Sequence, residues 1–303
     1  MSDRIEIIDV APRDGLQSQA RILDTESKLE LIRRLINAGV RRIEVASFVN
    51  PKRVPQMADA DEVIKGLPRM DGVKYIGLVL NMRGFERALA SGIDEVNSVV
   101  VATDTFSLRN QGMSTEESMA MAQTIIAQSG PGLPFRGVTI SAAFGCPFEG
   151  EVLQGRVVEI AARLADMGYE EIALADTIGV AGPSDVSRMI DAVTRVTGNA
   201  RLRCHFHNTR NTGVANAYAA IQSGVKILDA SCGGVGGCPF APAATGNIAT
   251  EDVLYMLNRI PVATGIEIAK IMETAKWLGE RLGVELPAMV TRAGLFPSAC
   301  TGV

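Results

Sequence analysis

Two histidines, one residue apart, are the side chains in this chain best suited to bind a metal ion. The sequence of 303 residues holds only these two, His205 and His207. They stand at the end of a predicted strand, where residues i and i+2 project from the same face. A plainer interpretation is a pair of partly buried histidines that bond to polar neighbours. The shared face and the polar turn that follows favour a metal site.

Further polar side chains follow or end the other predicted strands. They are Arg13, Asp14 and Gln17 after the first strand, Glu44 in the second, Cys146 after the fifth, Asp176 at the end of the sixth, and Asn247 beyond the eighth. Two imidazoles, one carboxylate and one amide oxygen form a mixed nitrogen and oxygen set that suits Mg²⁺ or Mn²⁺. We therefore predict that Asp14, His205, His207 and Asn247 are the metal ligands.

Glu44 and Asp176 are predicted to orient these ligands or to pair with Arg13. For Glu44, a purely structural pairing with Arg13 is the alternative. Arg13 itself either forms a simple ion pair with Asp14 or stabilises a developing enolate oxygen. Cys238 follows four glycines in a stretch whose backbone is free to move and to approach a ligand, so we interpret it as a proton donor.

The elements that must position these residues alternate in a regular order. Short apolar runs, predicted as strands, lie at 5–10, 41–47, 73–80, 93–102, 135–143, 171–175, 201–206 and 226–230, and an amphipathic segment follows each. Eight such units predict a single-domain (β/α)8 TIM barrel over about residues 4–260, with a C-terminal helical extension over about 261–303. A doubly wound open sheet is the alternative, but the turn at 11–15 lacks a phosphate-binding pattern.

Composition excludes several classes of partner. The net charge is -4 and charges of both signs are scattered, which argues against nucleic acid and anionic membrane as partners. No run of 18 apolar residues predicts a membrane span. Five cysteines without a C-x-x-C pair, together with the absence of a signal peptide, predict reduced thiols and a cytoplasmic location.

Two other barrel chemistries fit poorly. A metal-dependent hydrolase with an H-x-H motif usually recruits further histidines, and none remain. A Schiff-base aldolase needs a lysine near the catalytic rim, whereas Lys74 and Lys226 begin strands and Lys52 lies in a loop.

With these residues in place, the chain resembles the 3-hydroxy-3-methylglutaryl-CoA (HMG-CoA) lyase family. The resemblance rests on the segments at 9–17, 43–52, 146–150 and 176–179, and above all on GGVGGCPFAPAATGNIATED at 233–252. It implies that the four predicted ligands hold a divalent ion, that Arg13 faces the reacting thioester, and that Cys238 is the catalytic cysteine of a mobile loop. It also implies a homodimer that cleaves an acyl-CoA to acetyl-CoA and acetoacetate.

The alternatives are a lyase for a different 3-hydroxyacyl-CoA, a condensing synthase of the same superfamily, and a silent CoA-ester binding protein. The synthases carry Glu-Arg where this chain has Cys238-Pro239. One departure leaves the acyl group open. The lyases usually read His-x-His-Asp-Thr, but here Asn208 follows His207, and Arg210 either binds a substrate carboxylate or faces solvent. Gln17, Asn110 and the neighbouring Arg109 are the candidates for contacts with CoA.

Overall fold

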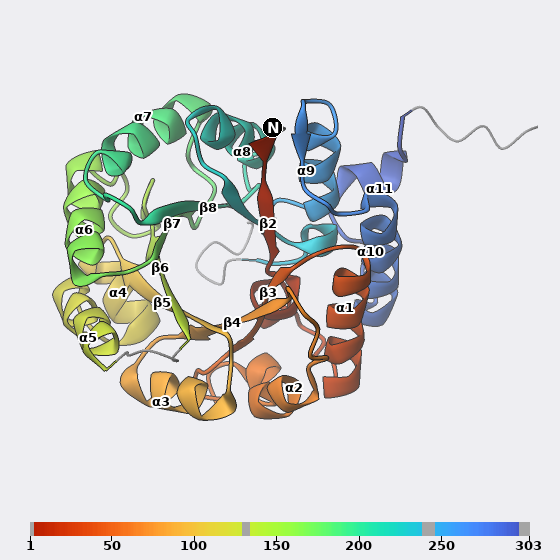
Figure 1. Cartoon of the computed structure of the whole chain (residues 1–303), viewed down its shortest axis with the longest axis horizontal. Helices are drawn as coiled ribbons and strands as arrows, with labels where there is room; N and C mark the ends of the chain where they lie inside the picture. The colour runs from red at the N-terminus through yellow and green to blue at the C-terminus, as the bar shows by residue number, and fades with distance from the viewer. Residues whose placement is uncertain (1–2, 129–133, 238–245, 297–303) are drawn as a thin grey trace, which may run out of the picture.

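Eight parallel strands close into a barrel in the computed structural model, which describes residues 3–128, 134–237 and 246–296. The strands are β2 (Glu6–Asp9), β3 (Arg42–Ser47), β4 (Lys74–Val79), β5 (Glu95–Val101), β6 (Phe135–Ser141), β7 (Glu171–Asp176), β8 (Arg201–Phe206) and β9 (Ile227–Ala230). Each pairs with the next, and β9 closes the ring on β2 (Figure 1). The predicted (β/α)8 barrel is confirmed.

Helices surround the strands and cover the outer face of the barrel (Figure 1). They are α1 (Thr25–Asn37), α2 (Ala60–Gly66), α3 (Met82–Ser91), α4 (Asp104–Gln111), α5 (Thr115–Ala127), α6 (Gln154–Met167), α7 (Pro183–Thr194), α8 (Gly213–Gln222) and α9 (Thr250–Leu257). Asp24 caps α1, because its carboxylate accepts the Ser27 amide. Helix α4 has no apolar stripe by which periodicity in the sequence could reveal it.

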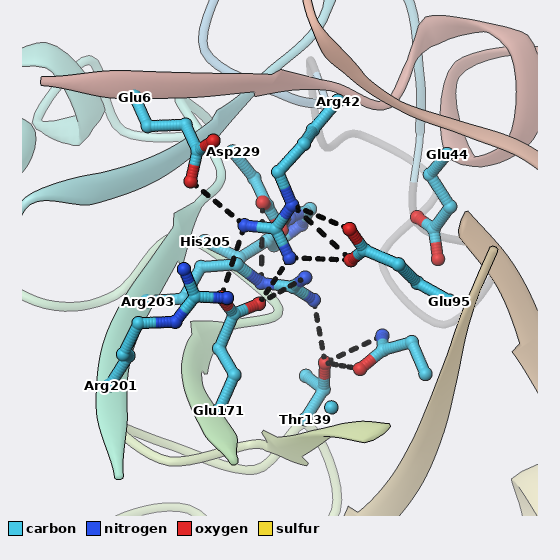
Figure 2. A network of polar contacts seen from close by, with 12 residues as sticks. Glu6, Arg42, Glu44, Glu95, Thr139, Glu171, Arg201, Arg203, His205 and Asp229 are labelled. Carbon is cyan, nitrogen blue, oxygen red and sulfur yellow. Dashed lines mark hydrogen bonds and ion pairs between the residues drawn. The ribbon is translucent and has the colours of Figure 1, made fainter. Parts of the chain in front are cut away.

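The amino-terminal end of the barrel interior is ionic. The guanidinium of Arg42 on β3 bonds to Glu95 on β5 and Glu171 on β7, with nitrogen to oxygen distances of 2.6 and 3.0 Å. Figure 2 shows this network, which also contains Glu6 and Arg203. The charged groups of this network pair with one another in the buried interior, where an unpaired charge would be unfavourable.

The C-terminal extension lies beside α1 and α9 (Figure 1). It contains β10 (Val262–Ala263), which pairs with β1 (Asp3–Arg4), followed by α10 (Ile268–Leu282) and α11 (Met289–Ala293). Two adjacent carboxylates of α9 hold α11: Asp252 accepts the amides of its first two residues, and Glu251 accepts the Thr291 hydroxyl. Glu251 also accepts the amide of Gly233, which follows β9. None of the described helices has the length and apolar character needed to cross a membrane.

Burial raises the pKa of Glu251 from 4.5 to about 7. At pH values between these two, Glu251 is ionised in the unfolded chain but protonated in the folded protein. The free energy of unfolding therefore falls as pH rises through this window. The full difference corresponds to roughly 3 kcal/mol. We expect Glu251→Gln, which resembles the protonated acid, to match the parent at pH 5 and to be more stable at pH 8.5. Urea denaturation at both pH values measures this; equal stability of the two proteins at pH 8.5 would contradict it.

Candidate active site

Asp14, His205 and His207 converge at the carboxyl end of the barrel. Each offers one ligand atom, and these atoms lie within 4.8 Å of one another. The two imidazoles come from the end of β8, and their ring centroids are 5.1 Å apart. Asp14 comes from a π-helical turn, Ala11–Gly15, that directly follows β2. The closed barrel therefore brings together residues separated by about 190 positions, and we call these three residues the triad.

The protonation states of Asp14 and His207 fit a divalent cation. Burial by itself would raise the pKa of Asp14, but Arg13 and the two imidazoles outweigh it and lower that pKa to about 2. Burial, together with the neighbouring His205, lowers the pKa of His207 to about 4. The carboxylate is thus ionised and His207 is neutral near pH 7, as metal coordination requires.

Asn247, the fourth predicted ligand, lies against the triad. Its Nδ2 donates to Asp14 Oδ2 at 2.8 Å and to the Val235 carbonyl at 3.2 Å. A half-turn of the amide would present its oxygen to the triad instead. Gly236 permits this close approach: its φ is +148°, and a Cβ there would lie 2.5 Å from Asn247 Nδ2. The glycine-rich stretch thus leaves room for the Asn247 side chain beside the triad.

Arg13 lies between two carboxylates. Its Nη1 donates to Asp14 Oδ1 at 2.7 Å and its Nη2 to Glu44 Oε2 at 2.6 Å. Arg13 lines the central cavity, whereas Glu44 on β3 does not. Of the two interpretations of Glu44, the structure shows the pairing with Arg13. Glu44 thereby fixes the direction in which the guanidinium points.

The triad lines a cavity of about 400 Å³. Its wall includes Arg13, the whole triad and two of the three candidate CoA contacts, Gln17 and Asn110. Leu78, Leu80, Val99 and Phe106 give it an apolar side. Gly237 also lines it, and Cys238, the next residue, lies outside the described residues. The arrangement offers a cation site, a guanidinium and an enclosed space in one place.

A family model described as HMGL-like matches residues 4–278. The chain belongs to the HMGL-like family. The (R)-citramalyl-CoA lyase of Chloroflexus aurantiacus is 43% identical, over 96% of this chain and 95% of that protein. The hydroxymethylglutaryl-CoA lyase YngG of Bacillus subtilis is 38% identical, over 94% and 95%. A solved HMG-CoA lyase of Acinetobacter baumannii, in complex with coenzyme A and 3-methylmalate, superimposes with a TM-score of 0.94 at 37% identity, over 98% of this chain and 97% of that one.

The resemblance found in the sequence is therefore confirmed, and this HMGL-like chain is a carbon–carbon lyase. The family is generally dependent on a divalent metal, and in this chain the triad has the residue types for one. The family model extends from the first barrel strand into α10. It thus includes part of the C-terminal extension as well as the barrel.

Two residues of the sequence analysis, Asp176 and Arg210, bond to backbone groups of the loop after β7 in this HMGL-like chain. Asp176 does not pair with Arg13; its carboxylate accepts the amides of Val180 and Ala181 at 2.9 and 3.0 Å. Arg210 is exposed, as one of its two interpretations expected, and its binding of a substrate carboxylate stays a prediction. Its Nη1 donates to the carbonyls of Ile178 and Gly179, both at 3.0 Å. Turns at strand ends leave backbone groups unpaired, and these two side chains satisfy them. Both residues therefore shape the loop after β7.

One functional residue, Asp229 on β9, was missed. Its Oδ2 lies 3.1 Å from His205 Nδ1, which leaves Nε2 of that imidazole to face a cation. Arg203 Nε lies 3.4 Å from the other oxygen of Asp229 (Figure 2). The one sequence signal was an acid inside an otherwise apolar predicted strand, 226–230.

Asp229→Asn is expected to weaken cation binding about 10–100-fold, because a metal-bound imidazole depends on the group that orients its other nitrogen. Burial opposes protonation of His205, but the hydrogen bond and charge of Asp229 raise its pKa. The amide removes that charge, so the pKa of His205 should fall. Calorimetric titration with Mn²⁺ measures the affinity, and NMR titration of the imidazole measures the pKa. Unchanged Mn²⁺ affinity would show that Asp229 does not orient this ligand.

Proposed function

We propose that this chain cleaves a 3-hydroxy-3-carboxyalkyl-CoA thioester by a retro-Claisen reaction. HMG-CoA, which would give acetyl-CoA and acetoacetate, is the first candidate substrate. The similarity to a citramalyl-CoA lyase supports a second, citramalyl-CoA, which would give acetyl-CoA and pyruvate. The observation that carries the proposal is the joint lining of one cavity by Arg13 and the Asp14, His205 and His207 triad.

Different residues of the site would carry out the successive steps of the reaction. A divalent cation held by the triad and Asn247 would lower the pKa of the substrate hydroxyl. Asp14 or His205 accepts the hydroxyl proton as the C2–C3 bond breaks. Arg13, held by Glu44, stabilises the negative charge on the thioester enolate oxygen. Cys238 then gives a proton to the enolate carbon, and acetyl-CoA and the keto acid leave.

Three assignments accompany this proposal. Gln17 and Asn110 contact the CoA portion of the substrate, because both line the cavity that would hold the acyl group. Asp14, His205, His207 and Asn247 would hold the Mg²⁺ or Mn²⁺ ion, which would supply Lewis-acid chemistry. The protein acts as a cytoplasmic homodimer.

The test is a panel of thioesters assayed at a fixed concentration of Mg²⁺ or Mn²⁺. Acetyl-CoA and the keto acid are identified by mass spectrometry. Cleavage of HMG-CoA or citramalyl-CoA that disappears after exhaustive chelation supports the proposal. Binding of both thioesters without cleavage would favour the silent binding protein, and net condensation from acetyl-CoA would favour a synthase.

A further inference from the structure

The cavity extends below the triad on one side of the barrel. Four neighbouring strands line it with two inward-facing residues each, in or directly after the strand: Asn97 and Val99 on β5, Thr139 and Ser141 on β6, Ala175 and Thr177 on β7, and Arg203 and His205 on β8. Residues i and i+2 on a strand are about 7 Å apart, so Arg203 lies one step deeper than His205. We call the part lined by Asn97, Thr139, Ser141 and Arg203 the recess.

The opposite side of the barrel interior is filled. Ile8, Val10, Ile76 and Ile227 pack there as a separate apolar cluster. Bulky branched side chains of this kind normally fill the whole interior of such a barrel. On the β6 and β7 side, Gly137, Ala173 and Ala175 occupy comparable positions with almost no volume. The recess therefore follows from small side chains on these two strands.

The floor of the recess is a chain of polar groups. Asn97 Nδ2 donates to the Thr139 hydroxyl at 3.0 Å, and Arg203 Nη2 donates to the same oxygen at 3.3 Å (Figure 2). The Arg203 side chain is only 4% exposed, yet its Nε makes no hydrogen bond in the described part of the chain. The Ser141 hydroxyl, at the recess wall, has no hydrogen-bond partner there either. An alkyl group in this space would exclude water from these polar groups without offering them a hydrogen bond in its place.

The charge around Arg203 disfavours an anion in the recess. Two buried guanidinium groups, Arg42 and Arg203, face three buried carboxylates, Glu95, Glu171 and Asp229. Arg203 Nη1 already bonds to Glu171 Oε1 at 3.1 Å. A fourth carboxylate beside this network would add like charge where screening by water is weak. A neutral hydroxyl can exchange hydrogen bonds with Ser141 without that cost.

We propose that the recess binds the third substituent of the substrate's carbinol carbon, and that this substituent is an uncharged hydroxylated arm. The inference rests on the proposed function. In a citramalyl-type substrate of that reaction, the carbinol carbon carries both the hydroxyl and the carboxylate that the cation site would hold. The long CoA arm must leave through the cavity mouth, where Arg53 and Pro55 are exposed. The remaining substituent of a tetrahedral carbon then points inward, toward Thr139 and Ser141. The preferred substrate is R–C(OH)(COO⁻)–CH₂–CO–SCoA with R = CH₂OH.

The test compares two thioesters that differ in one atom of R. Hydroxymethyl gives hydroxypyruvate and acetyl-CoA, ethyl gives 2-oxobutyrate and acetyl-CoA, and the hydroxyl proton moves to the CH₂ carbon in both. We expect kcat/KM to be at least about tenfold higher for hydroxymethyl, because a site built for a hydroxyl discriminates against the analogue that lacks it. An equal or higher kcat/KM for ethyl overturns the proposal, and so does a higher kcat/KM for a carboxymethyl arm.

Substitutions of recess residues test the same proposal. Ser141→Ala and Thr139→Val should each reduce the hydroxymethyl over ethyl preference about tenfold. The control is Ser98→Ala: this buried hydroxyl of β5 bonds to Tyr169 outside the barrel wall, and its loss should leave the preference unchanged. Thermal unfolding confirms that each variant is folded. A preference that survives in both recess variants overturns the assignment.

Assays of HMG-CoA and citramalyl-CoA distinguish a failure of this inference from a failure of the proposed function. If HMG-CoA and citramalyl-CoA are both inert with metal, the proposed function fails and the inference falls with it. If either is cleaved while ethyl equals or exceeds hydroxymethyl, the proposed function stands and the recess assignment alone is wrong.

Discussion

His207→Ala is expected to lose Mn²⁺ binding and to lower kcat/KM by about 10³-fold or more. Loss of one ligand from the triad removes a metal whose charge stabilisation contributes several kcal/mol, and each 1.4 kcal/mol is about a factor of ten in rate. His207 is 4% exposed and its Nε2 lies 4.0 Å from Asp14 Oδ2, so no outside group can easily replace it. Calorimetry with Mn²⁺ and steady-state kinetics on HMG-CoA and citramalyl-CoA measure the two losses.

The control for this prediction is Arg188→Gln. That side chain is 65% exposed on α7 and its ion pair is at the surface, so both Mn²⁺ affinity and kcat/KM should match the parent. Thermal unfolding shows whether His207→Ala is folded. A folded variant that binds Mn²⁺ as tightly as the parent would remove His207 from the ligand set. Parental turnover in a folded variant without Mn²⁺ binding would show that the reaction needs no cation.

Cys238→Ser is expected to lower kcat by about 10²–10⁴-fold, the range that a positioned general acid contributes. A serine hydroxyl is a far weaker acid than a thiol, so it cannot protonate the enolate carbon efficiently. Mn²⁺ affinity should not change, because the triad and Asn247 remain intact. The measurements are kcat with saturating thioester and calorimetry with Mn²⁺.

Cys300→Ser provides the matched control, since it makes the same chemical change far along the sequence. It should keep the parental kcat. If Cys238→Ser also keeps the parental kcat, another group protonates the enolate and the role assigned to Cys238 is wrong. A loss of Mn²⁺ affinity in Cys238→Ser would instead assign the cysteine to cation binding.

Tertiary contacts show which backbone groups two of the predicted residues bind. Asp176 stands at a strand end, like a catalytic residue of a barrel, but its carboxylate binds two backbone amides of its own loop. Arg210 stands next to the histidine pair, yet it bonds to two carbonyls of the neighbouring loop. Position along the chain fixes where a Cα lies within a few ångströms. It does not fix which of several nearby partners a long side chain chooses.

The sequence by itself determined the barrel, because alternating periods of two and 3.6 residues repeat eight times and a closed parallel sheet satisfies them all. It also determined that both histidines face one way, because their spacing equals the strand period. Only the tertiary structure decided that Asp229 meets His205, that Glu44 directs Arg13, and that a polar recess opens on the β5–β8 side. These contacts join residues that lie 24 to 64 positions apart in the sequence. They depend on side-chain volume and hydrogen-bond direction across the barrel, which no local pattern encodes.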